Sequence, residues 1–216
     1  MRLRGCPTIK FEEGWDIIEK GVLKVTECLK RDLKHEISES LMYKDIYTTI
    51  YKMCNQKPPH YYSQQLYGKY RESFQEYITL TVLPALREVD GEFMLREFMK
   101  CWENHKIMLR FMSNMFYCLD IYFVDEMSLD SLAKVGIMSF LELVYHDKHV
   151  NVKKVVIDLI NRELEGEQID RALLRNAVNI FVEIGMDHMD FYKNDFEAPL
   201  LEDTGTIILE RLLYGF

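Results

Sequence analysis

Glycine and proline are scarce in this chain, with 10 glycines and 5 prolines among 216 residues. That is about 7%, against roughly 12% in average proteins. Both residues interrupt regular helices, so their scarcity favours long helical segments. No proline occurs between Pro84 and Pro199, and no segment keeps the alternation of polar and apolar residues that is typical of strands. The sequence therefore predicts an all-α protein.

The chain also lacks an excess of basic residues and any long apolar run. Its 27 Lys and Arg are outnumbered by 35 Asp and Glu, for a net charge of -8. Nucleic acid is therefore a poor partner, because the attraction to phosphates that dominates such binding is missing. No run of ~18 apolar residues is present, and the first residues lack the apolar core of a signal peptide. We expect a soluble intracellular protein without a membrane partner.

Signatures of catalysis and metal binding are missing as well. The five cysteines are odd in number, widely scattered and without a CxxC pair: Cys6, Cys28, Cys54, Cys101 and Cys118. This pattern predicts reduced, mostly buried thiols, with no disulfide, structural zinc or cofactor. Glycine-rich phosphate loops, nucleophile elbows and zinc-protease motifs do not occur. The alternative is a helical enzyme in which Cys101 and His105, four residues apart, form a thiolate–imidazole pair. The prediction is that the chain is not an enzyme.

Hydrophobic residues recur at helical spacing along most of the chain. The loop 55–60 contains two adjacent prolines, and Pro84 should kink or end the helix that starts at Ser63. A cap is predicted at Ser40, a second at Asp170, and a C-terminal glycine at Gly185. The helices are expected over 12–29, 40–53, 63 to beyond 78, 92–102, 106–123, 129–145, 151–164, 170–184 and 188–201.

The helix expected over 106–123 is apolar almost all round. One sector of about 100° holds Met108, Met112, Met115, Phe116, Leu119 and Phe123. The other sectors are also mostly apolar and hold Phe111, Cys118, Ile121 and Tyr122. Such a helix is either wholly internal or buries one face against a partner, and the residues leave both readings open.

The helix expected over 40–53 carries an aromatic stripe. Tyr43, Ile46, Tyr47 and Ile50 lie within about 100° of one another, while Tyr51 and Met53 point elsewhere. Aromatic residues beside exposed charge are favoured at the centres of protein interfaces. Ordinary core packing is the more frequent explanation of such a stripe.

Several long stretches resemble the N-terminal part of cullins, and most closely the plant cullins that scaffold the SCF (Skp–cullin–F-box) ubiquitin ligases. The likeness is collinear from about Phe11 to Thr204. It is carried by YTTIYKMC (47–54), KPPHYYSQQLYGKYRESFQEYI (57–78), LREFMKCWENHK (95–106), EGEQIDRALLRN (165–176) and VEIGM (182–186).

The resemblance implies tandem cullin repeats, which are five-helix bundles stacked end to end into a stalk. The first would span 1–125 and the second 126–204, followed by a divergent tail, 205–216. It further implies a non-catalytic scaffold module of the ubiquitin-dependent degradation system in cytoplasm and nucleus. A Skp-type adaptor, and indirectly F-box proteins, would dock on the second and fifth helices. Carried over by position, the docking residues would be Tyr43, Ile46, Tyr47, Ile50, Met112, Met115, Phe116, Leu119 and Phe123.

Three departures from the family bear on this expectation. Lys44-Asp45 stands where the plant cullin resembles Met-Met, and Met115 replaces a phenylalanine. The chain stops at Phe216, before the region that in a full cullin holds the RING subunit and the Nedd-modified lysine. We therefore expect no RING subunit as partner. The apolar tail 205–216 is expected to fold back over the second repeat. The alternative is a cullin-derived protein whose adaptor binding is lost or weak, acting as an inactive or decoy scaffold.

Overall fold

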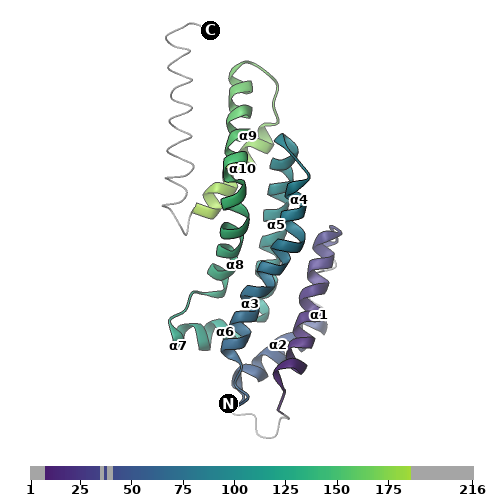
Figure 1. Ribbon diagram of the computed structural model, residues 1–216, viewed down its shortest axis with the longest axis vertical. Coiled ribbons are helices and arrows are strands. Elements are labelled where there is room, and N and C mark those ends of the chain that lie inside the picture. Colours follow the sequence, from purple (N-terminus) through teal and green to yellow (C-terminus); the bar gives the residue numbers. More distant parts are fainter. Residues whose placement is uncertain (1–7, 35–36, 38–40, 186–216) are drawn as a thin grey trace. The chain divides into compact units, whose positions relative to one another are not determined.

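The computed structural model describes residues 8–34, 37 and 41–185. Every regular element among these residues is a helix (Figure 1), which confirms the all-α prediction. The predicted cap at Ser40, the helix 188–201 and the tail 205–216 lie outside them. The elements are α1 (Phe11–Lys30), α2 (Leu41–Asn55), α3 (Ser63–Tyr77), the π-helical turn η2 (Ile78–Val82), α4 (Leu83–Arg87), α5 (Gly91–Met115), α6 (Tyr117–Leu119), the π-helical turn η3 (Asp120–Val124), α7 (Asp125–Met127), α8 (Leu132–Phe140), the π-helical turn η4 (Leu141–Tyr145), α9 (His146–Leu164) and α10 (Arg171–Gly185).

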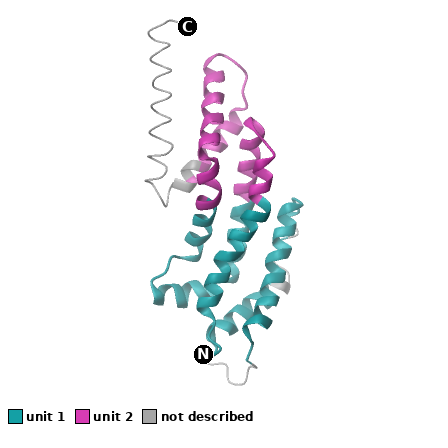
Figure 2. Ribbon diagram, viewed as in Figure 1, with its two compact units in different colours: residues 1–81, 104–140 teal, residues 82–103, 141–216 magenta. Residues whose placement is uncertain are grey.

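The chain divides into two compact units, shown in Figure 2. Unit 1 comprises residues 1–81 and 104–140, and unit 2 comprises residues 82–103 and 141–216. The predicted boundary near residue 125 does not coincide with this division, because α5 contributes residues to both units. The assignment of repeats to 1–125 and 126–204 stays a prediction.

In unit 1, α1 and α2 pack closely because α1 presents two glycines to α2. A Cβ atom on Gly14 would lie 2.3 Å from the sulfur of Met53, and one on Gly21 would lie 2.2 Å from Cδ1 of Ile46. The two glycines are seven residues apart, so they share a face of the helix. α1 ends at Lys30. Two residues further on, Asp32 has a left-handed φ of 57°, and Leu33 donates its N–H to the carbonyl of Cys28 at 2.8 Å. This is the usual C-terminal cap of a helix.

The separate helices expected over 92–102 and 106–123 are a wrong prediction. A single helix, α5, runs from Gly91 to Met115, because no glycine or proline occurs between Gly91 and Gly136 to end it. The break falls at Phe116, with φ -92° and ψ 11°, and α6 and η3 follow it. The loop 55–60 and the change of helix type around Pro84 are close to the prediction, since α4 begins with Pro84 in its first turn.

The helix expected from Leu129 begins later than predicted. Ser128 has a left-handed φ of 51°, which ends α7. α8 starts at Leu132, whose N–H donates to Oδ1 of Asp120 at 3.0 Å. η4 and α9 then follow directly in the chain, so the predicted gap between 145 and 151 is absent as well. The hydroxyl of Ser131, directly before the helix, also accepts the N–H of Lys134 at 3.2 Å. A local N-cap and a side-chain acceptor twelve residues away therefore mark the start of α8 together.

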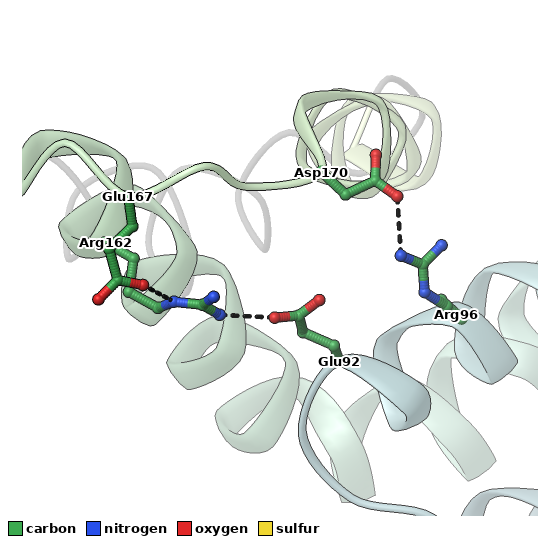
Figure 3. Close-up of polar contacts among 5 residues, drawn as sticks. All are labelled: Glu92, Arg96, Arg162, Glu167 and Asp170. Atoms are coloured by element: carbon green, nitrogen blue, oxygen red, sulfur yellow. Dashed lines mark hydrogen bonds and ion pairs between the residues drawn. The ribbon is translucent and has the colours of Figure 1, made fainter.

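Ion pairs connect α5, α9 and the connection between α9 and α10 in unit 2 (Figure 3). Arg162 donates Nη1 to Glu92 at 2.6 Å and Nε to Glu167 at 2.6 Å. Arg96 donates Nη2 to Asp170 at 2.7 Å. Asp170 also accepts the N–H of Leu173 at 2.9 Å, which confirms it as the predicted N-terminal cap of α10. These contacts join the start of α5 to the connection that precedes α10.

Among the described residues, no single helix is both long and apolar enough to cross a membrane. The pair of segments Gly91–Met115 and Tyr117–Met127 reaches that length and composition only together, and it is bent by 64°. Much of its apolar content lies in the interior of unit 1, where Met108, Met112 and Leu119 are fully buried.

Candidate docking surface on α2 and α6

Seven of the nine predicted docking residues form the interior of unit 1. Each exposes 5% or less of its surface: Ile46, Ile50, Met112, Met115, Phe116, Leu119 and Phe123. The Phe116 ring packs edge-on against the ring of Tyr70, with centroids 5.3 Å apart. Ile46 points toward Gly21 of α1. Adaptor contact by these seven stays a prediction, and it would need side chains that pack inside the unit.

The two remaining predicted docking residues, Tyr43 and Tyr47, and further large side chains of the same two elements lie at or near the surface. Tyr43 on α2 is 36% exposed, and Tyr47 and Tyr51 beside it are half-buried. On α6 and η3, Tyr117, Ile121 and Tyr122 expose 57%, 40% and 61% of their surface. We refer to these side chains as the α2–α6 surface: Tyr43, Tyr47, Tyr51, Tyr117, Ile121 and Tyr122. Among the described residues, this is where exposed tyrosines concentrate on neighbouring elements.

Tyr47 lies in the α2 part of this surface, next to Tyr51. Its ring stacks on Tyr51 with centroids 6.4 Å apart. Burial raises the pKa of Tyr47 above its ordinary value, and the neighbouring ionisable groups Cys118, Tyr43 and Tyr122 add to that increase. The hydroxyl of Tyr43 meanwhile donates to the backbone carbonyl of Asn114 at 3.2 Å. Tyr43 is thus fastened to the end of α5 and Tyr47 to its neighbour Tyr51, which limits the rotamer freedom that a partner would have to restrict.

The sector of 106–123 that supplied the predicted docking residues is the buried one. Of the residues on the other sectors of 106–123, Ile121 and Tyr122 reach solvent, whereas Cys118 is buried. All six residues of the first sector, counted through the break at Phe116, are buried, so helical periodicity identified the buried side of this segment. Lys44 and Asp45, the charged departures from the family, are exposed beside Tyr43.

The cysteine and histidine considered for catalysis are engaged elsewhere. Cys101 donates to Oε1 of Glu97 at 4.0 Å, and burial raises the pKa of its thiol to about 12. Nε2 of His105 lies 2.9 Å from the carbonyl of Gly136, and burial lowers the pKa of this imidazole to about 4. A thiolate–imidazolium pair needs both shifts in the opposite direction. Among the described residues, no group of three or more His, Cys, Asp or Glu side chains could hold a metal ion.

Comparison with known proteins identifies the family. The model of the cullin alpha solenoid domain matches residues 15–208. The chain is 55% identical to rice Cullin-1 over 197 residues, which is 91% of this chain and 26% of that protein. It is 46% identical to putative cullin-like protein 2 of Arabidopsis thaliana over 200 residues, 92% of this chain and 53% of that protein. Cullin-like protein 3 of Arabidopsis thaliana is 39% identical over 202 residues, 93% of this chain and 77% of that protein.

The chain thus spans about a quarter of the length of rice Cullin-1 and about half of putative cullin-like protein 2. The matched region covers both compact units and agrees with the helical architecture of the described residues. A family model over most of its length and relatives of high identity together establish that this chain belongs to the cullin family.

Proposed function

We propose that this chain is a scaffold module of the cullin type, which docks a small Skp-type adaptor protein through the α2–α6 surface. Through that adaptor it would carry F-box proteins into the ubiquitin-dependent degradation system. The observation that carries the proposal is the exposure of Tyr117 and Tyr122, each more than half accessible, beside the half-buried tyrosines of α2. Tyrosine supplies a large contact area at low entropic cost, and it is enriched where binding energy concentrates.

Family membership is a separate argument for the same surface. The resemblance assigns adaptor docking to the second and fifth helices of the first repeat, which correspond to α2 and to the segment that ends in α6 and η3. The exposed side chains on those elements are the candidates for direct contact. The buried residues of the same elements would act indirectly, by fixing the two backbones against each other.

Calorimetric titration of the full chain with a purified Skp-type adaptor tests the proposal. Tyr122→Ala and Tyr117→Ala should each weaken binding at least tenfold, which corresponds to about 1.4 kcal/mol. Phe93→Ala is the matched control, because Phe93 is an aromatic residue that is 75% exposed in unit 2. Met115→Ala is unsuitable as a contact test: Met115 is 1% exposed, so its truncation opens a cavity in the core.

Absence of binding by the unaltered chain at tens of micromolar adaptor would contradict the proposal. A second candidate function would then gain support, namely a cullin-derived protein with weak adaptor binding. The specific observation behind it is the exposed Lys44-Asp45 pair beside Tyr43, because a partner that covers Lys44 must remove water from its charge. Lys44→Met should restore binding if that charge is the cause, and should leave affinity unchanged if it is not.

A further inference from the structure

The segment that carries Tyr117, Ile121 and Tyr122 depends on other elements of unit 1 for its conformation. It consists of three short helical pieces: α6 and α7 have three residues each, and η3 has five. Even as one continuous stretch they are shorter than the ~12–15 residues below which an isolated helix is only marginally stable in water. Contacts from outside the segment must therefore hold these three side chains where they are.

Asp120 and Tyr67 make such contacts toward the two ends of η3. At the start of η3, Oδ1 of Asp120 accepts the N–H of Leu132 at 3.0 Å, which joins η3 to the first residue of α8. Near its end, the ring of Tyr67 on α3 packs against that of Phe123, with centroids 6.2 Å apart. The hydroxyl of Tyr67 donates to the backbone carbonyl of Asp130 at 2.9 Å. The same side chain thus holds both η3 and the connection between α7 and α8.

Between these two anchors, η3 exposes two neighbouring residues. Ile121 and Tyr122 expose 40% and 61% of their surface, whereas Leu119 and Phe123 on either side expose 5% or less. Burial of apolar side chains favours contact but has no preferred direction. A hydrogen bond does have one. The bond at Asp120 therefore restricts rotation of η3 about its axis, and with it the direction in which Tyr122 leaves the surface.

We propose that Asp120 and Tyr67 are positioning residues of the α2–α6 surface, which hold η3 in the orientation that presents Ile121 and Tyr122 to the adaptor. The inference rests on the proposed function for the identity of the partner, whereas the positioning is a property of the free chain. Both side chains are half-buried and spend their polar atoms on the backbone of unit 1. A surface that is ordered in advance binds more tightly, because the partner does not have to restrict it.

Ser131 offers a matched control at the same junction. Its hydroxyl accepts the N–H of Lys134 at 3.2 Å and so caps α8 from a position directly before the helix. Ser131→Ala and Asp120→Ala each remove one side-chain acceptor from the start of α8, but only Asp120 belongs to η3. If Asp120 merely stabilised α8, the two variants would behave alike.

Hydrogen exchange of the full chain, without adaptor, tests the positioning. Asp120→Ala should speed exchange of the amides of 119–124 by about fivefold or more, the factor that one hydrogen bond typically contributes. Asp120→Asn should exchange like the unaltered chain, because its amide oxygen still accepts a hydrogen bond. Ser131→Ala should speed exchange only at the start of α8.

Two variants of Tyr67 test the second anchor in the same experiment. Tyr67→Phe keeps the ring against Phe123 and loses only the hydroxyl, so it should speed exchange in 128–131 and leave 119–124 protected. Tyr67→Ala loses both contacts and should speed exchange in both segments. Because Tyr67→Phe removes a single hydroxyl, it also covers the case in which a larger truncation fails to fold.

Calorimetric titration with a purified Skp-type adaptor measures the consequence for binding. Asp120→Ala should weaken the affinity by about fivefold or more, whereas Asp120→Asn and Ser131→Ala should stay within about twofold of the unaltered chain. Equal losses of affinity in Asp120→Asn and Asp120→Ala would overturn the proposal, because they would make Asp120 a direct contact that acts through its charge.

Unchanged exchange of 119–124 in Asp120→Ala would overturn the proposal as well, as would equally fast exchange in Ser131→Ala. Failure of the unaltered chain to bind the adaptor is a different result, which contradicts the proposed function. The exchange measurements need no adaptor, so they would still decide whether Asp120 and Tyr67 hold η3 in place.

Discussion

At the scale of single residues, His105 is the clearest case of a side chain whose chemistry is set by its surroundings. It is fully buried, and its ring lies among those of Phe74, Tyr77 and Phe140. Burial lowers its pKa to about 4. The unfolded chain, with an imidazole pKa of about 6.5, binds the proton more readily, so acid favours unfolding. The stabilisation is complete above about pH 6.5 and is lost as the pH falls toward 4.

A quantitative prediction follows for this histidine. Between about pH 7.5 and pH 5, the free energy of unfolding of unit 1 should fall by about 2 kcal/mol through His105 alone. His105→Gln should be less stable at neutral pH but should lose that pH dependence. Urea unfolding at both pH values measures this, with His60→Gln, on a half-buried loop histidine, as the control. An unchanged slope with pH in His105→Gln would show that other groups cause the acid sensitivity.

At the scale of elements, close packing of α1 on α2 depends on a glycine. We expect Gly21→Ala to destabilise the chain by about 1–3 kcal/mol, because the new methyl group would meet the buried Ile46 at 2.2 Å. Gly68→Ala is the matched control, since no atom lies within 4 Å of its Cβ position in α3. There alanine should stabilise by up to about 1 kcal/mol through helix propensity. The melting temperatures of the two variants should shift in opposite directions. Equal shifts would contradict the close approach of α1 to α2.

The start of α10 makes a second prediction at this scale. Asp170 caps the helix by accepting the N–H of Leu173 and pairs with Arg96, and these contacts lower its pKa below the ordinary value. Asp170→Ala should speed hydrogen exchange of the first amides of α10, and Asp170→Asn should largely preserve their protection because asparagine caps as well. Asp158→Ala, at an exposed position of α9, is the control. Equally fast exchange in the alanine and asparagine variants would mean that the ion pair with Arg96, and not the cap, protects these amides.

At the scale of the whole molecule, the two tryptophans of the chain report separately on the two units. Trp15 belongs to unit 1 and Trp102 to unit 2, where its indole donates to Glu183 at 2.9 Å. Because His105 lies in unit 1, lowering the pH from about 7.5 to 5 should destabilise the transition reported by Trp15 more than the one reported by Trp102. Trp102→Phe and Trp15→Phe isolate the two signals. Coincident transitions at both pH values would show that the units unfold as one.

Helical class, family and most element positions followed from the sequence, because they rest on local properties. Scarce glycine and proline, the 3.6-residue period and the cap at Asp170 act within a few residues of where they stand. The collinear likeness to cullins needed only the order of residues. α1, α3 and the loop that follows α2 accordingly lie close to their predicted positions.

The exposed face of each helix was decided by tertiary contacts instead. Ile46 is buried because Gly21 lets α1 approach it, and Phe116 because the helix breaks there and its ring meets Tyr70. At the start of α8 the distant Asp120 accepts the N–H of Leu132, beside the local cap at Ser131. The causes of burial at Ile46 and Phe116 lie far away in the chain or at an unmarked break, so periodicity could identify apolar sectors but not which one faces solvent. The sequence alone therefore determined an all-helical cullin chain, while packing between distant residues decided that tyrosines of α2 and α6 form its candidate docking surface.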